Sequence, residues 1–64
     1  MAEYYTIDSD KLAQVVALVQ ARHPLTAEQV RQFCLDDWPE GDEHQRWLDS
    51  ASAEEIADWV VAGL

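Results

Sequence analysis

Positive charge is scarce in this 64-residue chain. One lysine and three arginines stand against thirteen acidic residues, which gives a formal net charge of −9. A surface this acidic is repelled by nucleic-acid phosphates and by anionic membrane surfaces. We therefore expect no direct binding to DNA or RNA and no association with membranes.

Cysteine and long apolar runs are scarce as well. Cys34 is the only cysteine, so the chain cannot form an internal disulfide and does not require an oxidising compartment. The first residues lack the basic start and apolar core of a secretory signal peptide. The longest strongly apolar run, Val15–Val19, is far too short to cross a bilayer. These features predict a soluble, cytoplasmic protein.

The short length limits what the chain can enclose. A domain of about 60 residues buries only about 60% of the surface that its unfolded chain exposes. Little room is left for an enclosed active site. The hydrophobic fraction is nevertheless 48%, with three tryptophans, well above that of disordered acidic segments. We expect residues 1–64 to fold as one small domain.

Three positions have the sequence pattern of a helix start. Asp8, Thr26 and Ser52 are good N-cap residues, and each follows an apolar residue that can pack on the first turn of a helix. Gln29 and Glu55 lie three residues after the second and third caps and complete capping boxes. The pattern predicts helices that begin directly after residues 8, 26 and 52.

Apolar spacing and helix breakers give the extents of the helices. The residues before Pro24 and Pro39 are pushed out of the helical region, and Gly63 is typical of a helix end. No segment alternates apolar and polar residues, so we expect no sheet. The predicted fold is an all-α bundle of three to four short helices, with residues 1–7 extended or frayed. The expected helices span residues 9–22, 27–37, 43–50 and 53–62.

Two segments, 26–35 and 52–61, resemble each other in sequence. One interpretation is an internal duplication. The other, which we favour, is that a capping box followed by an apolar face imposes similar residues on both. Two copies fall short of the three or more that a repeat array requires.

No motif in the chain predicts catalysis or a cofactor. A glycine-rich phosphate loop, a nucleophile elbow and metal-ligand spacing are all absent from the sequence. Cys34 lies on the apolar face of its predicted helix, where we expect burial, and no third group orients it with His23 as a nucleophile and base. His44 is expected to be solvated. A calcium loop centred on Gly41 fails, because tryptophans stand where it needs oxygen ligands. We expect no enzyme, no metal and no cofactor.

The acidic residues fall into two groups. Many precede or begin a predicted helix, where negative charge complements the helix dipole. Asp36, Asp37 and Asp49 lie near predicted helix ends, where the dipole disfavours them, and Glu40 lies in the connection between. Leu35 and Val61 fall off the main apolar faces, so we expect them to be partly exposed. The candidate partner-binding residues are Leu35, Asp36, Asp37, Trp38, Glu40, Asp49 and Val61.

These features favour a small interaction module. It would bind a protein partner, or itself as a homo-oligomer, through an apolar patch rimmed by carboxylates. A second hypothesis is an acidic inhibitor that imitates nucleic acid and occupies the binding groove of a DNA- or RNA-binding protein. A third is a salt-adapted protein without a specific partner.

Overall fold

The computed structural model describes residues 5–35 and 43–64, and these residues form four α-helices and no strand. The all-α prediction is confirmed. The first helix is shorter than expected, because the backbone N–H groups of Arg22 and His23 both donate to the carbonyl oxygen of Val19 and turn the chain. Residues 36 and 37, the predicted end of the second helix, lie outside the described residues. The four helices are α1 (Ser9–Gln20), α2 (Ala27–Leu35), α3 (Glu43–Ser50) and α4 (Ala53–Ala62).

The predicted helix starts are confirmed at atomic detail. Asp8 accepts a hydrogen bond of 3.2 Å from the backbone N–H three residues on. Thr26 and Gln29 bond reciprocally, at 2.9 Å from the Thr26 N–H to Oε1 and 3.1 Å from the Gln29 N–H to Oγ1. Ser52 and Glu55 form the same box at 3.1 and 3.2 Å. Side-chain oxygens therefore satisfy backbone donors that have no partner inside the helix.

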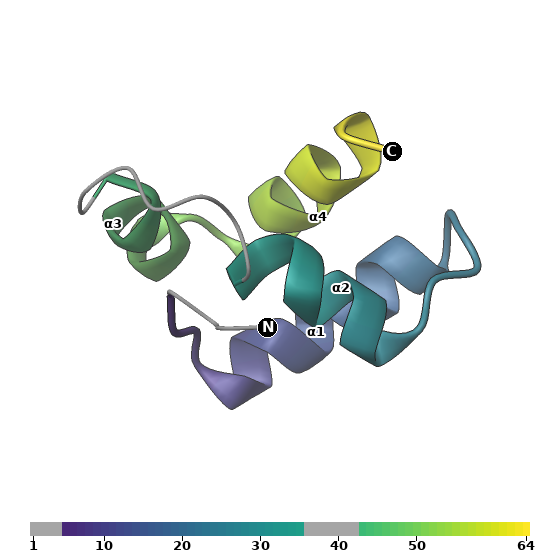
Figure 1. Cartoon of the computed structure of the whole chain (residues 1–64), viewed down its shortest axis with the longest axis horizontal. Coiled ribbons are helices and arrows are strands. Elements are labelled where there is room, and N and C mark those ends of the chain that lie inside the picture. Colours follow the sequence, from purple (N-terminus) through teal and green to yellow (C-terminus); the bar gives the residue numbers. More distant parts are fainter. Residues whose placement is uncertain (1–4, 36–42) are drawn as a thin grey trace.

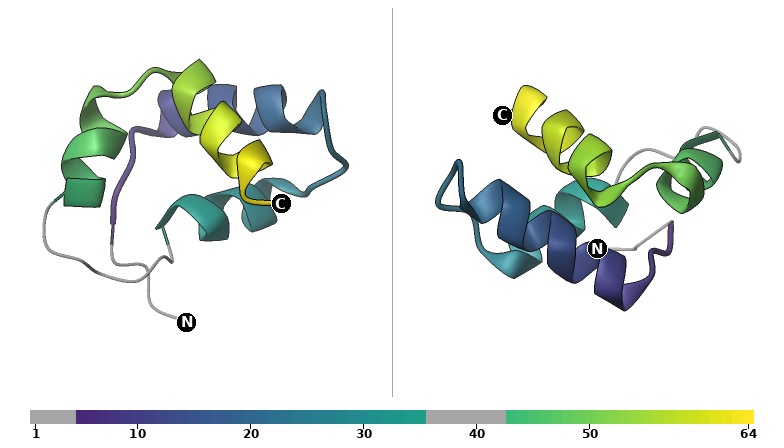
Figure 2. Two further views of the ribbon diagram at one scale, coloured as in Figure 1. Left: turned by 90° about the horizontal axis from the view of Figure 1, so that it is seen from above. Right: turned by 180° about the vertical axis from the view of Figure 1, so that it is seen from behind.

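The core lies where α1, α2 and α4 pack against one another, with α3 beyond one end of them (Figures 1 and 2). Each helix contributes its apolar face, and α3 contributes through Leu48. No helix in the described part of the chain is both long and apolar enough to cross a membrane. The side chains that are fully buried are Leu48, Ile56, Val15, Val19, Val30, Val60 and Cys34.

The single lysine joins α1 to the junction between α3 and α4. The ammonium of Lys11 donates to the carbonyl oxygens of Leu48, Asp49 and Ala51, at 2.9, 3.1 and 3.0 Å. These carbonyls end α3 or follow it, and they carry the negative end of its dipole. One charge therefore satisfies two acceptors that the last turn of α3 leaves without partners and a third in the residue that follows the helix.

The segment before α1 is held against α3. The backbone N–H of Thr6 donates to Oε1 of Gln45 at 2.9 Å, and Nε2 of Gln45 donates back to the Thr6 carbonyl at 2.8 Å. Tyr5 is only 5% exposed. The sequence predicts that residues 1–7 are extended or frayed. Residues 5–7 are non-helical, but they are held against α3 and are not frayed.

Removing the Lys11 ammonium should destabilise the fold. Lys11→Met keeps the length of the side chain but leaves three carbonyls without this donor, and we expect a loss of about 2 kcal/mol in the free energy of unfolding. Urea unfolding followed by circular dichroism measures it. Gln14→Met, at an exposed position of the same helix, is the control. Equal stabilities of the two variants would contradict the assigned role.

Candidate functional site

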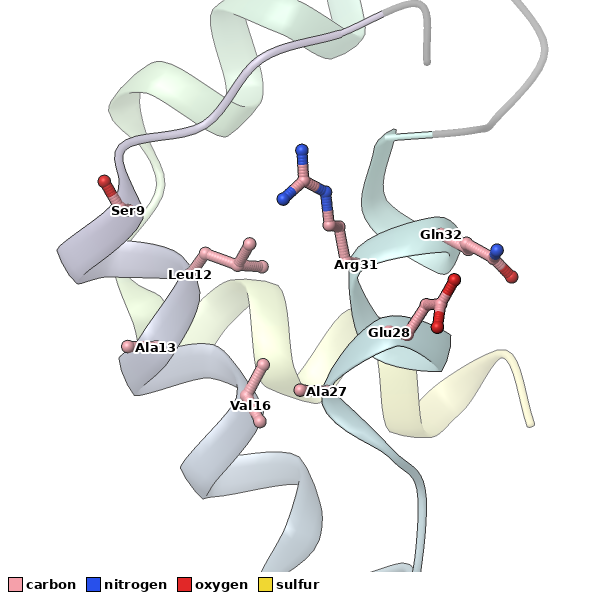
Figure 3. A pocket seen from close by; sticks show the side chains of 8 residues that line it. All are labelled: Ser9, Leu12, Ala13, Val16, Ala27, Glu28, Arg31 and Gln32. Atoms are coloured by element: carbon pink, nitrogen blue, oxygen red, sulfur yellow. The ribbon is translucent and has the colours of Figure 1, made fainter. Parts of the chain in front are cut away.

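A groove of about 650 Å³ lies between α1 and α2 (Figure 3). Leu12 and Val16 extend from α1 towards α2, whereas Glu28 and Gln32 point away from α1 (Figure 3). The groove thus has an apolar floor and a polar rim. We call it the α1–α2 groove; its lining residues are Ser9, Leu12, Ala13, Val16, Ala27, Glu28, Arg31 and Gln32.

The groove exists because small residues line the seam between the two helices. Ala13 and Ala27 have no atoms beyond Cβ with which to fill the space, and both are exposed. Leu12 and Val16 are only half-buried, although their neighbour Val15 is fully enclosed. The inner side of the seam is therefore packed core, and the outer side is an apolar surface open to solvent. Such concave apolar surfaces with a few polar groups are typical of binding sites.

A smaller hollow of about 240 Å³ continues the groove towards the N-terminal segment. It shares Ser9, Leu12 and Arg31 with the α1–α2 groove. Its other lining residues come from the segment before α1 and from the end of α2: Tyr5, Thr6, Ile7 and Leu35. The concave surface therefore extends along the first two turns of α1.

The residues predicted to bind a partner differ in how far they are buried. Leu35 is only 3% exposed, so its expected exposure is wrong. Leu35 lines the same hollow as Tyr5, Thr6 and Ile7, so the segment before α1 lies next to the part of α2 that helical periodicity predicts to be exposed. Val61 is half-buried and packs against the core. The four candidates Asp36, Asp37, Trp38 and Glu40 lie outside the described residues.

Asp49, the remaining candidate, is exposed on α3. Its Oδ1 accepts a hydrogen bond of 3.0 Å from Nε2 of Gln45, and its carbonyl oxygen accepts from Lys11. Among the described residues, Leu64 is the large apolar side chain that is mostly exposed, at 56%. The apolar surface in this part of the chain is therefore concave, between helices, rather than a protruding patch.

The sequence analysis missed the residues of the α1–α2 groove. Helical spacing assigns Leu12 and Val16 to the apolar stripe of the first helix and Ala27 to the apolar face of the second, and it gives Ala13 no role. A signal was present, because a small residue stands beside the apolar stripe of the first helix, at Ala13, and another begins the apolar face of the second, at Ala27. It becomes meaningful only when the two helices are known to pack side by side.

Several exposed carboxylates already have partners within the chain. Asp8 and Glu55 cap helices. Asp58 forms an ion pair of 2.7 Å with Arg22, and both side chains are more than half exposed. An exposed pair of this kind contributes little to stability. Part of the acidity thus serves local structure.

His44 is not solvated as expected. Its Nε2 lies 3.0 Å from the carbonyl oxygen of Cys34, which links α3 to α2. Its ring centroid lies 4.6 Å from that of Tyr5, 5.7 Å from that of Trp47 and 5.2 Å from that of Trp59. The imidazole is therefore a packed member of an aromatic cluster, and it carries a structural hydrogen bond.

Cys34 is buried, as expected for a small hydrophobic residue. Burial raises the pKa of its thiol from 9.0 to about 11. Because only the thiolate is an effective nucleophile, this side chain is unreactive at neutral pH. Within residues 5–35 and 43–64, no three His, Cys, Asp or Glu side chains gather in a way that could hold a metal ion.

Comparisons with protein-family models, with curated proteins and with solved structures found no match. The inference of function therefore rests on the α1–α2 groove and on the charge of the chain.

The thiol of Cys34 should be protected from alkylation in the native state. At pH 8, a pKa raised by two units leaves about a hundredfold less thiolate than an unperturbed thiol has. We expect iodoacetamide to react at least that much more slowly with the native protein than with the protein in urea.

The same pKa shift makes stability fall at high pH. Between pH 9 and about 11 the unfolded chain releases the thiol proton before the native chain does. The free energy of unfolding of the wild type should therefore decline more steeply over this range than that of Cys34→Ala. Parallel curves for the two proteins would contradict the shift.

Gly63 is a position where added bulk should not help. Replacing an exposed glycine by alanine stabilises a compatible backbone by about 0.4–1 kcal/mol. Here a Cβ atom would lie 2.6 Å from Cζ of Phe33, whose ring packs on Trp59 with 5.2 Å between the centroids. We expect Gly63→Ala to lower the free energy of unfolding by about 1 kcal/mol, because overpacking displaces the ring. In a Phe33→Ala background the same change should become neutral or stabilising, and thermal unfolding of the four proteins completes the cycle.

Proposed function

We propose that this chain is a protein-interaction module that binds an amphipathic helix of a partner protein in the α1–α2 groove. The observation that carries the proposal is the apolar floor made by Leu12, Ala13, Val16 and Ala27, which stays open on the surface of a small folded domain. An apolar concave surface of this kind gains free energy when a partner removes it from water.

The shape of the groove favours a helix as the occupant. Two helices form its walls, and its α1 wall extends from Ser9 to Val16, a rise of about 10 Å or two helical turns. A third helix can lie along such a seam and insert side chains spaced at i, i+3 or i+4, and i+7. Leu12 and Val16 would then contact successive anchors of the partner.

A second copy of this chain is a poor occupant. Each copy carries a formal charge of −9, so two copies repel each other at neutral pH and low salt. The hypothesis of an acidic inhibitor that imitates nucleic acid rests on charge alone. It is the weaker of the two, because the carboxylates of Asp8, Glu55 and Asp58 already bond within the chain. The apolar floor is therefore the stronger guide to the partner.

Selection from a helical peptide library tests the proposal. The peptides would be about five turns long, with varied apolar residues along one face and Lys, Gln or Glu at the other positions. Binding is selected on the wild-type protein and counter-selected on Ala13→Glu, which places a carboxylate in the groove. Ala17→Glu is the matched control: it makes the same change at an exposed position on the same helix, outside this groove.

We expect peptides that bind the wild type and Ala17→Glu but lose at least about tenfold in affinity for Ala13→Glu, because a buried unpaired charge opposes binding. Amide chemical shifts should change around Leu12, Val16 and Ala27. If no peptide is enriched, or if enriched peptides bind Ala13→Glu equally well, the groove is not the binding site.

A further inference from the structure

Resting on the function proposed above, we infer that the partner helix is basic. Its apolar face would enter the α1–α2 groove, and lysine or arginine residues would flank that face. The proposed function specifies the apolar residues of the partner helix. The charge of this chain would favour, among helices with those residues, the ones that are also basic. The supporting observations are the net charge, the engagement of Lys11 and Arg22 within the chain, and the position of Glu28 in the lining of the groove.

The distribution of cations gives the first argument. The ammonium of Lys11 is held by three carbonyl oxygens at the end of α3. The guanidinium of Arg22 pairs with Asp58, and neither residue lines the α1–α2 groove. These two cations therefore do little to attract an acidic partner to the groove. The field that a partner meets on approach is that of a chain with thirteen acidic residues.

The surroundings of the groove give the second argument. Glu28 is exposed and lines the α2 wall near Ala27. Asp8 and Asp10, the sequence neighbours of the lining residue Ser9, are exposed, and neither lines the groove. Arg31 is the cationic residue of the lining, so Glu28 and Arg31 balance within it, and the excess of negative charge belongs to the rest of the chain. A helix with flanking cations complements this pattern, whereas an acidic helix would be repelled.

The experiment compares matched versions of one groove-binding peptide from the selection. The versions share their apolar anchors and differ only in carrying Lys, Gln or Glu at the flanking positions. Their dissociation constants would be measured at about 0.1 M and about 1 M salt, between which the Debye length falls from about 10 Å to about 3 Å.

Glu28→Gln and Glu54→Gln provide a matched pair of variants. Both glutamates are exposed and occupy the second position of their helix, but only Glu28 lines the α1–α2 groove. Each substitution removes one negative charge and perturbs its helix dipole equally. A difference between the two variants therefore reports on the groove and not on net charge.

At the lower salt we expect the Lys version to bind about tenfold more tightly than the Gln version, and the Glu version to bind most weakly. High salt should remove most of this difference. Glu28→Gln should weaken the Lys version by about two- to fivefold, the range of one exposed ion pair, and Glu54→Gln by less.

Equal affinities of the Lys and Gln versions would overturn the basic partner while leaving the groove as the binding site. Equal effects of the two glutamate variants would also overturn it, because the attraction would then not be placed at the groove. Failure of all three versions to bind would instead remove the proposed function.

Discussion

The ammonium of Lys11 is the interaction on which the arrangement of the helices depends. A helix ends with carbonyl oxygens that point along its axis without partners, and burying such groups unpaired is costly. In this chain one side chain from α1 reaches the carbonyls that end α3 and begin the turn to α4. It therefore ties α1 directly to the end of α3 and to the turn that begins α4.

The same contact explains how a domain of this size holds α3 in place. Helices α1, α2 and α4 share an apolar core, whereas α3 adds Leu48 and two of the aromatic rings. Polar contacts supplement that packing: Gln45 binds the backbone of Thr6, and His44 contacts the carbonyl of Cys34. Small domains have little area to bury, so such contacts between distant segments matter more than they would in a larger protein.

Local rules made the helices predictable from sequence. The caps at Asp8, Thr26 and Ser52 act within one turn, so their chemistry is readable without knowing the fold. The burial of Cys34 followed from helical periodicity, which is also local. The predicted end of α1 is two residues too late, because the hydrogen bonds to the Val19 carbonyl turn the chain before it reaches Pro24.

Contacts between segments far apart in sequence could not be predicted in this way. Leu35 lies off the apolar face of its helix, and it is buried beside a hollow that the segment from Tyr5 to Ile7 and residues of α1 also line. His44 is polar in isolation, yet its ring packs against Tyr5 and Trp59 from distant segments, in addition to Trp47 of its own helix. The α1–α2 groove likewise depends on which helices are neighbours. Periodicity gives the apolar face of each helix, but it does not show which part of that face remains exposed to solvent after the helices pack.

An open apolar floor on so acidic a chain has a consequence for colloidal behaviour. At neutral pH the repulsion between copies protects the exposed groove from self-association. The isoelectric point lies near pH 4.2, where that repulsion vanishes. The acceptors of Lys11 are carbonyl oxygens, which do not titrate there, so the pH change that brings the net charge to zero leaves the partners of this contact unaltered. Around its isoelectric point the protein keeps the partners of the Lys11 contact but loses the electrostatic barrier that separates its copies.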